Sequence, residues 1–432
     1  MADIRNSCDI CESELKRLGI KKYAFSAAEA EKREFNVDGG EFSLFRTLFD
    51  NAVSVTVFED GRKGVAQANK TDGETVRRTV ADAHAAAQAA APDDAWDIAP
   101  KHDFSPVTDG APDCDTELLF SRTKEFVADI KERYPKIMIE QLIVSHDRSH
   151  RIYRNSNGTE YECTAGEYGV SVMFSAHDGE EATSFFGSGA SCASLDKPFI
   201  ELGSINSDLR DVENQLYPKA LEGKFTGTMV LTPSSLGTFV DSIVDNFASD
   251  GVILNQTSIW KDKLGEKVAD SRISIRVDPR DPSVVCGERL TAEGFAAEGY
   301  DFIKDGVLEN FALSLYVANK VGGRRAPCSS FPCIVKAGDK SIKDIISGID
   351  RGILVGRFSG GDPGTSGDFS GVAKNSFYIE NGKIAYPLSE VMISGNLAQL
   401  LVNLTDISSE TVEDGGSSMP YMAFGGVTIS GK

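Results

Sequence analysis

The sequence has few histidines and fewer basic than acidic residues, and both shortages restrict its function. It contains five histidines and 45 basic against 65 acidic residues, for a formal net charge of −20. Such a charge repels phosphate backbones, so we expect no nucleic-acid partner. No run approaches the ~20 continuous apolar residues of a membrane helix, and the charged first 16 residues lack the apolar region of a secretory signal. We therefore predict a cytoplasmic protein without a membrane partner.

The sequence also lacks a second C-x-x-C to complete the one formed by Cys8 and Cys11. A four-cysteine zinc site is therefore not indicated. Both cysteines share one helical face with Ile4, Leu15 and Leu18, and Gly19 follows as a helix-ending residue. This spacing predicts that they are reduced thiols packed in a core.

Apolar periodicity predicts an α+β protein with antiparallel sheets and two domains, residues 1–222 and 223–432. In the first domain we expect strands over 21–58, 137–144 and 161–174, and helices over 72–91, 113–134 and 208–221. The helix over 113–134 directs Leu118, Leu119 and Phe126 toward a core. Hairpin turns are expected at Asp60-Gly61 and at residues 155–158.

The second domain is predicted to be rich in strands and to begin near Gly223. A strand over 228–231 precedes an amphipathic helix with Ser234 as N-cap. Its apolar positions follow i, i+3, i+4, i+7, i+8 and i+11: Leu236, Phe239, Val240, Ile243, Val244 and Phe247. Hairpins are expected at residues 305–306 and 380–382, and a helix over 342–352.

Hydrolytic motifs are scarce. Zinc peptidase chemistry needs two histidines on one helix face with a glutamate, whereas His146 and His150 lie between two strand-like runs, where we expect a polar hairpin. G-x-S-x-G is absent. Three S-x-x-K matches, at residues 121, 194 and 258, lack supporting motifs. Asp241 and Asp245 are expected to be a solvated pair on the polar side of the Ser234 helix.

A glycine-rich run spans residues 359–371. It lacks the G-K-[ST] ending of a phosphate loop, and a strand follows it rather than a helix. Two interpretations stay open: a tight surface loop that needs positive φ angles, or backbone left bare for the close approach of a ligand or peptide.

A series of motifs in the last third of the chain resembles the PmbA/TldD family, with weaker similarity back to the N-terminal half. The motifs are residues 350–355, Ser359-Gly360-Gly361, Gly367-Asp368-Phe369-Ser370-Gly371, residues 378–384 and Ile393-Ser394-Gly395-Asn396-Leu397. The resemblance implies the fold of that family. It also implies two homologous subunits that degrade small or unfolded peptides within a closed chamber.

The resemblance further implies that this chain is the PmbA-like (TldE) subunit without a zinc site. The TldD-type subunit carries H-E-x-x-x-H and a cysteine near its C-terminus. Counting back from Gly265-Glu266 places Asp241, Ser242 and Asn246 where the motif would stand, and no cysteine follows Cys333. We thus expect no catalytic residue, metal or cofactor in this chain, with zinc in a TldD-like partner.

The partner is expected to be a TldD-like zinc peptidase, in a heterodimer, or a second copy, in a homodimer. Six residues are predicted to bind peptide or to line the chamber: Gly360, Gly361, Gly367, Asp368, Gly395 and Asn396. Two alternatives remain: a stand-alone regulatory protein of the gyrase-modulator type, and an enzyme whose chemistry has no recognisable motif.

Overall fold

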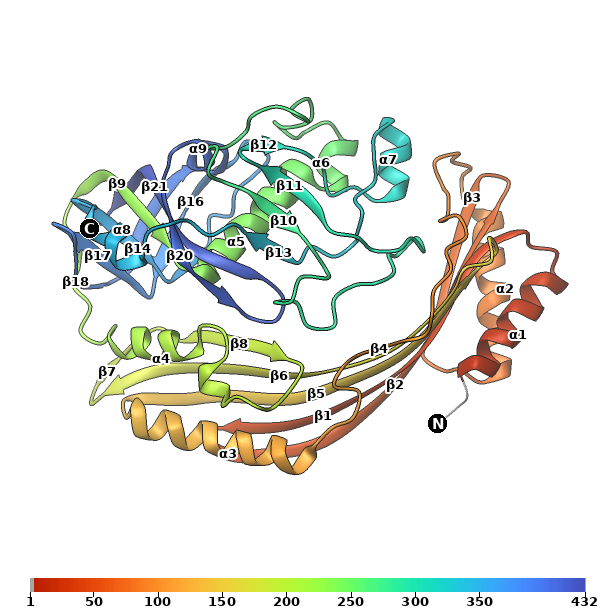
Figure 1. The fold of residues 1–432 in the computed structure, drawn as a ribbon, viewed down its shortest axis with the longest axis horizontal. Coiled ribbons are helices and arrows are strands. Elements are labelled where there is room, and N and C mark those ends of the chain that lie inside the picture. Colours follow the sequence, from red (N-terminus) through yellow and green to blue (C-terminus); the bar gives the residue numbers. More distant parts are fainter. Residues whose placement is uncertain (1–3, 432) are drawn as a thin grey trace.

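Two sheets of different shape organise the chain (Figure 1). The computed structural model describes residues 4–431. An eight-stranded sheet in the N-terminal part (residues 4–222) has the order β3-β2-β1-β5-β6-β4, with β7 and β8 also paired to β6. A 13-stranded sheet lies in the C-terminal part (residues 223–431), above one face of the first sheet. The predicted α+β class is confirmed.

The N-terminal sheet is built from four unusually long strands, which carry helices at both ends. Its strands are β1 (Lys22–Asp38), β2 (Glu41–Glu59), β3 (Arg62–Ala68), β4 (Val107–Gly110), β5 (Ile137–Asn155), β6 (Glu160–Asp178), β7 (Glu181–Ala182) and β8 (Phe186–Cys192). Its helices are α1 (Ile4–Arg17), α2 (Gly73–Ala89), α3 (Thr116–Arg133) and α4 (Ile205–Glu213).

The C-terminal part has shorter elements. Its strands are β9 (Lys224–Leu231), β10 (Ile275–Val277), β11 (Tyr300–Lys304), β12 (Val307–Leu308), β13 (Cys333–Val335), β14 (Arg351–Val355), β15 (Arg357–Ser359), β16 (Asp368–Lys374), β17 (Ser376–Glu380), β18 (Lys383–Leu388), β19 (Val391–Asn396), β20 (Leu404–Glu413) and β21 (Ser418–Ser430). Its helices are α5 (Pro233–Ile243), α6 (Asp250–Leu254), α7 (Leu315–Val321), α8 (Ile342–Ser347) and α9 (Leu397–Val402). Across residues 4–431 we find no helix with both the length and the apolar character to cross a membrane.

Strands β1, β2, β5 and β6 are long because they connect two separate cores. They have 17 to 19 residues, against about 5–6 in a typical strand. One end packs on α1 and α2, where Cys8, Cys11 and Val55 are buried. The other end packs on α3 and α4 around Phe35 and Phe126. The strands must therefore span both helix pairs.

The predicted environment of the C-x-x-C is confirmed. Cys8 and Cys11 lie inside the α1 core as free thiols, and burial raises the pKa of Cys8 to about 12. Gly19 follows the helix with a φ of +74°. These cysteines therefore act as small apolar side chains.

The amphipathic helix after residue 232 is confirmed as α5, with a different N-cap. Thr232 caps it, because its hydroxyl accepts from the Ser235 N–H and Pro233 occupies the first helical position, which proline favours. The prediction of Ser234 as N-cap is wrong. A π-helical turn over Val244–Ala248 continues the helix.

Two predictions for the N-terminal part are wrong for reasons of packing. His146 and His150 lie within strand β5, which pairs with β1 and β6 through this region, so the expected polar hairpin does not form. Leu118 is 40% exposed, because the buried face of α3 runs through Leu119, Phe126 and Ile130.

Three further predictions need correction. The helix expected over 208–221 is α4, which starts at Ile205 and ends at Glu213. The helix expected over 342–352 ends at Ser347, because Arg351 begins strand β14. The sheets are mixed rather than antiparallel throughout, with parallel pairs β9–β14, β13–β21 and β4–β6.

Candidate functional site

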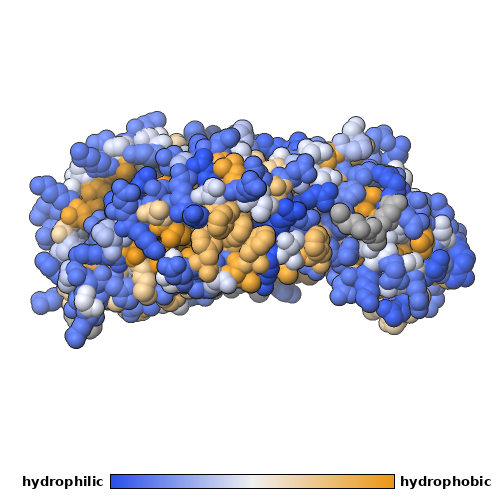
Figure 2. Space-filling view, turned by 90° about the horizontal axis from the view of Figure 1, so that it is seen from below, coloured by the Kyte–Doolittle hydropathy of each residue, from blue (hydrophilic) through white to orange (hydrophobic). Residues whose placement is uncertain are grey.

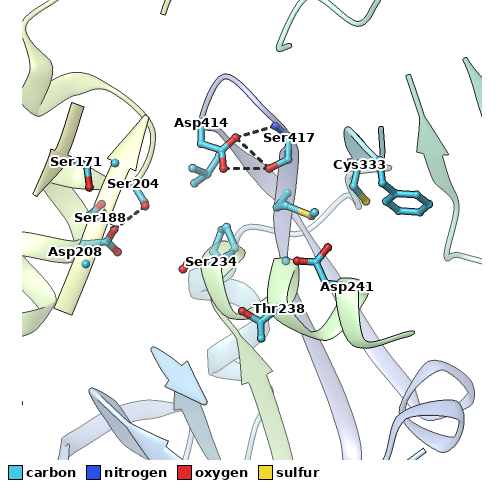
Figure 3. Close-up of a pocket in the computed structure, with 17 residues that line it drawn as sticks. Ser171, Ser188, Ser204, Asp208, Ser234, Thr238, Asp241, Cys333, Asp414 and Ser417 are labelled. Carbon is cyan, nitrogen blue, oxygen red and sulfur yellow. Dashed lines mark hydrogen bonds between the residues drawn. The ribbon is translucent and has the colours of Figure 1, made fainter. Parts of the chain in front are cut away.

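A cavity of about 440 Å³ opens between the N-terminal and C-terminal parts (Figure 3). Its N-terminal wall comes from β6, β8 and α4, and its C-terminal wall from α5, β13 and the β20–β21 turn. Small and hydroxyl-bearing side chains dominate it, among them Ser171, Ser188, Ser204, Ser234, Thr238 and Ser417. The lining offers hydrogen-bond donors and acceptors and leaves space for a ligand.

Helix α5 presents one face to the cavity and a second to the core. Ser234, Thr238 and Asp241 line the cavity at positions i, i+4 and i+7. Phe239 packs in the core, with ring centroids 5.3 Å from Phe358 and 5.4 Å from Phe369. The aromatic contacts behind the helix thus fix its polar face toward the cavity.

Asp208 is the most strongly perturbed carboxyl group in the cavity. It accepts hydrogen bonds of 2.6 Å from both Ser188 Oγ and Ser204 Oγ. Burial raises its pKa to about 6, since loss of solvent disfavours the charged form more than the two hydroxyl groups favour it. The carboxyl therefore changes charge close to neutral pH, as groups at functional sites often do.

Two further carboxylates face the cavity from the C-terminal part. Asp414 closes the β20–β21 turn, where its Oδ1 accepts from the Ser417 N–H at 2.7 Å (Figure 3). The same oxygen accepts from the Gly416 N–H at 2.9 Å. Asp241 is exposed to the cavity, but the surrounding protein displaces enough water to raise its pKa, and Asp245 adds to this effect. The cavity is acidic and rich in hydroxyl groups.

The cavity's donor set does not fit zinc. Zinc in proteins is held by imidazole, thiolate and carboxylate groups. Cys333 lies in the wall, where burial raises the pKa of its thiol. No histidine is among the described residues that line the cavity. Over the part of the chain that the structure describes, no three histidine, cysteine, aspartate or glutamate side chains are placed to hold a metal ion.

The two histidines of the H-x-x-x-H spacing have other partners. His146 Nε2 lies 2.7 Å from the Ala111 carbonyl oxygen, and His150 Nε2 lies 3.0 Å from Glu162 Oε1. Both are on β5, and their rings are directed to different elements. The two rings do not converge on one site. The local structure is a strand, and not the hairpin that was expected.

Of the three positions predicted to replace a zinc motif, only Asp241 lines the cavity. Ser242 Oγ donates to the Thr238 carbonyl at 3.0 Å, and Asn246 Nδ2 donates to the Ser242 carbonyl at 2.9 Å. Both side chains are therefore bonded to their own helix. Asp245 is not among the described residues that line the cavity. Of the two carboxylates expected to form a solvated pair, Asp241 therefore faces the cavity and Asp245 faces the outer surface.

The predicted glycine positions form a tight loop behind α5 and do not line this cavity. Gly360, Gly361 and Gly367 have φ angles of +69°, +62° and +85°. A Cβ on Gly361 would lie 1.7 Å from the Ser370 carbonyl oxygen. Positive φ and close backbone approach thus explain these glycines without a ligand.

Asp368, Gly395 and Asn396 also bond within the fold. Asn396 Nδ2 donates to Asp368 Oδ1 at 2.9 Å, and its Oδ1 accepts from the Gln399 N–H as the N-cap of α9. A Cβ on Gly395 would lie 2.9 Å from the Phe369 ring. The amide predicted to meet a peptide is occupied by these internal bonds.

Four residues of the cavity were not among the candidate site residues predicted from the sequence: Ser188, Ser204, Asp208 and Asp414. Asp208 and Asp414 are separated by 206 positions, and the packing of β8 against the β20–β21 turn, where the Ser191 N–H donates to the Asp414 carbonyl at 2.8 Å, brings them to one cavity. The one local signal was Gly187-Ser188-Gly189 in a strand, because glycines in strands often mark a close approach of another backbone.

Comparison with known proteins gives one consistent family. Residues 223–431 match the PmbA/TldA metallopeptidase C-terminal domain, and residues 26–87 match the PmbA/TldA metallopeptidase domain 1. "Metalloprotease PmbA" of Escherichia coli O157:H7 is 24% identical, over 92% of this chain and 88% of that protein. A "Zinc metalloprotease TldD homolog" of Saccharolobus solfataricus is 23% identical, over 70% of each chain.

Solved structures share the fold over nearly the whole chain. TldE from Thermococcus kodakarensis superimposes with a TM-score of 0.82 at 19% identity, covering 98% of this chain and all of that one. A candidate modulator of DNA gyrase from Bacteroides thetaiotaomicron gives 0.87 at 21% identity, with both chains fully covered. Matched sequence domains at both ends and a shared fold between them lead to one conclusion: this chain belongs to the PmbA/TldD family of metallopeptidase-type proteins.

Proposed function

We propose that this chain is the PmbA/TldE-like subunit of a TldD–TldE-type zinc metallopeptidase complex that degrades small or unfolded peptides, and that it holds no zinc itself. One observation carries the proposal. The family resemblance places the metal motif at residues 241–246, and of these Asp241 faces a cavity whose described lining includes no histidine and one buried cysteine, Cys333. The helix and the cavity are present, while the donor set is unsuited to zinc.

The role of the cavity in this proposal is to hold peptide. Strand β8 pairs with β6 along one edge. On its other edge the Ser191 N–H donates to the Asp414 carbonyl at 2.8 Å, and no described strand pairs with the part of this edge before Ser191. Gly187, Ser188 and Gly189 of β8 line the cavity. An extended peptide added to this edge would bond through its main chain, which tolerates many sequences. The hydroxyl groups opposite, on α5, would bond the peptide's remaining polar groups.

The first experiment concerns metal and activity. We expect the purified chain to hold no stoichiometric zinc and to show no chelator-sensitive peptidase activity. Co-expressed with a TldD-like homologue, it should form an active complex. Stoichiometric zinc in the isolated chain would contradict the proposal. Failure to co-purify would favour the stand-alone regulator, the alternative that the gyrase-modulator description of one structural neighbour suggests.

The second experiment tests the cavity with Gly187→Val. A Cβ on Gly187 would meet nothing within 4 Å, so a valine fits the strand and extends into open space at the cavity wall. We expect peptide turnover by the complex to fall at least tenfold with assembly intact. Gly364→Val is the matched control, since its Cβ also meets nothing within 4 Å and it lies outside the cavity. Equal turnover in the two variants would exclude β8 from peptide binding.

A further inference from the structure

A second cavity, of about 270 Å³, lies where the β2–β3 hairpin meets the start of α7 (Figure 1). Its N-terminal side comes from this hairpin and from residues 96–98, and its C-terminal side from residues 250, 292–293 and 314–316. The described residues that line it are all different from those that line the Asp208 cavity, so the two cavities are separate. Six side chains give it its character: Phe58, Lys63, Trp96, Asp250, Glu293 and Tyr316.

Hydrogen bonds and an ion pair around the cavity hold its two sides together. Tyr316 Oη donates to Asp93 Oδ2 at 2.9 Å, and Lys320 Nζ lies 2.8 Å from the same oxygen. The Ala99 N–H donates to the Glu293 carbonyl at 3.0 Å. Each of these contacts joins the N-terminal part to the C-terminal part. The cavity is therefore formed without a ligand, which lowers the cost of binding one.

Lys63 supplies a positive charge from the N-terminal side. Its Nζ lies 4.1 Å from the centre of the Trp96 ring, and the ring centroid of Tyr316 lies 3.8 Å from that of Trp96. Two groups this close to the centre cannot share one face of the ring, so Trp96 is held between them. Burial lowers the pKa of Lys63, and the charge of Glu293 offsets part of this effect. Since Lys63 makes no hydrogen bond or ion pair with any residue that the structure describes, its three donors are unused.

Two carboxylates supply negative charge from the C-terminal side. Asp250 Oδ1 accepts from the N–H of residue 314 at 2.9 Å, and Glu293 Oε1 accepts from the N–H of residue 315 at 3.2 Å. Neither carboxylate forms an ion pair with a described residue, and the second oxygen of each accepts no hydrogen bond from one. The remaining carboxylate of the lining, Asp97, lies 2.8 Å from Lys22 Nζ and is neutralised by it. The cavity thus has an unpaired cation on one side and two unpaired anions on the other.

We propose that this cavity binds a small zwitterion, a free amino acid or a dipeptide, with its carboxylate at Lys63 and its ammonium at Asp250 and Glu293. A ligand with one charge would leave the groups of the opposite side without a partner, which weakens binding. The volume lies just below the ~300–1,000 Å³ of sites for drug-sized ligands and fits a smaller molecule. Phe58 and the edge of Trp96 offer apolar contact to a side chain such as that of leucine. The inference goes beyond the proposed function, because it needs neither peptide hydrolysis nor a zinc-bearing partner.

The fluorescence of Trp96 measures binding to the purified chain. The chain has two tryptophans, and Trp260 is 3% exposed within the C-terminal core, so a ligand-dependent change reports on Trp96. We expect L-leucine and L-leucyl-L-alanine to bind with dissociation constants of about 1 mM or lower. N-acetyl-L-leucinamide, which lacks both charges, should bind at least tenfold more weakly. Binding of only one of the two zwitterions supports the proposal and fixes the size of the ligand. Absence of binding for both, in fluorescence and in calorimetry, would overturn it, as would equal binding of the uncharged analogue.

Two variants assign the charges, with calorimetry as the readout. Lys63→Met keeps an apolar side chain beside Trp96. It should weaken L-leucine binding at least tenfold and leave L-leucinamide, which lacks the carboxylate, unchanged. Glu293→Gln should weaken L-leucine at least fivefold, since Asp250 stays, and leave N-acetyl-L-leucine, which lacks the ammonium, unchanged. Lys70→Met is the matched control, because Lys70 is exposed and outside the described lining.

Equal losses for the zwitterion and its one-charge analogues would refute the assignment of charges, and so would a loss of the same size in the control variant. The comparison of ligands on the wild-type chain needs no variant, so the proposal stays testable if a substitution disturbs folding. Every readout is binding to the single chain. The outcome here and that of the proposed function, which is measured by zinc content and peptide turnover, are therefore distinguishable.

Discussion

Helix α5 and the first half of β2 carry similar amounts of apolar side chain and have opposite surroundings. On α5 the apolar residues recur at helical spacing and are buried, from Leu236 to Ile243. On β2 they occupy both faces between Phe42 and Phe49 and are all exposed. The α5 pattern is one-sided and the chain's own sheet covers it. The β2 pattern is two-sided, and the described chain leaves these five side chains 41–64% exposed, although Phe120 of α3 packs on Phe42. Figure 2, viewed from the α3 side, shows a group of apolar side chains in the middle of that face of the molecule.

The largest effect should come from a charge placed in the buried apolar stripe that runs along α5. Val244 is 9% exposed and belongs to the core around α5. Val244→Asp would bury a carboxylate without a partner and lower the free energy of unfolding by about 3 kcal/mol or more. Urea denaturation measures this fall in the free energy of unfolding. Val402→Asp, at a 54% exposed position, should change stability by only about 0.5 kcal/mol. Equal midpoints for both variants would show that the α5 stripe faces no core.

A smaller loss of stability is expected from a substitution in the loop of Gly361, on the core side of α5. Gly361 has a φ of +62°, and its Cβ would lie 1.7 Å from the Ser370 carbonyl oxygen. Gly361→Ala should therefore destabilise by about 2 kcal/mol through backbone strain and local displacement. Gly364→Ala, where a Cβ meets nothing within 4 Å, is the control for thermal unfolding. A loss no greater than that of the control would mean that the loop shifts freely and does not fix α5.

A pH-dependent effect should follow from Asp208 in the cavity. Its pKa is raised to about 6 from an ordinary value near 3.8, so the folded state binds the proton more tightly than the unfolded state does. This contribution is fully present below about pH 4 and is lost as the pH rises through about 6. Asp208→Asn stays neutral, so its stability relative to wild type should rise by up to about 2 kcal/mol between pH 4 and pH 7. A constant difference across this range would show that the carboxyl is well solvated.

Local sequence patterns predicted the helices and strands. Packing between residues far apart in the sequence decided which faces are buried and where the cavity lies. The alternation in residues 53–58 identified the covered half of β2, whereas Phe42 to Phe49 do not alternate and gave no sign of which face they would bury. The segment around His146 and His150 was predicted to be a hairpin turn. Polar residues in the middle of a long strand have the same local pattern as polar residues in a turn between two strands. The cavity combines α4 with the β20–β21 turn, and no sequence spacing links Asp208 to Asp414. The family resemblance singled out Asp241, Ser242 and Asn246 together as lost zinc positions, and of these three Asp241 lines the cavity.

The smallest effect should come from removing an apolar side chain in the exposed half of β2. Phe49 is 64% exposed, so its replacement by serine removes little buried surface from one chain. Phe49→Ser should therefore change the free energy of unfolding of the isolated chain by only about 0.5 kcal/mol. Phe35→Ser is the matched control on the neighbouring strand, because Phe35 is 6% exposed and its loss should cost about 3 kcal/mol or more. Urea denaturation measures both changes. A loss at Phe49 as large as the loss at Phe35 would show that this half of β2 is covered.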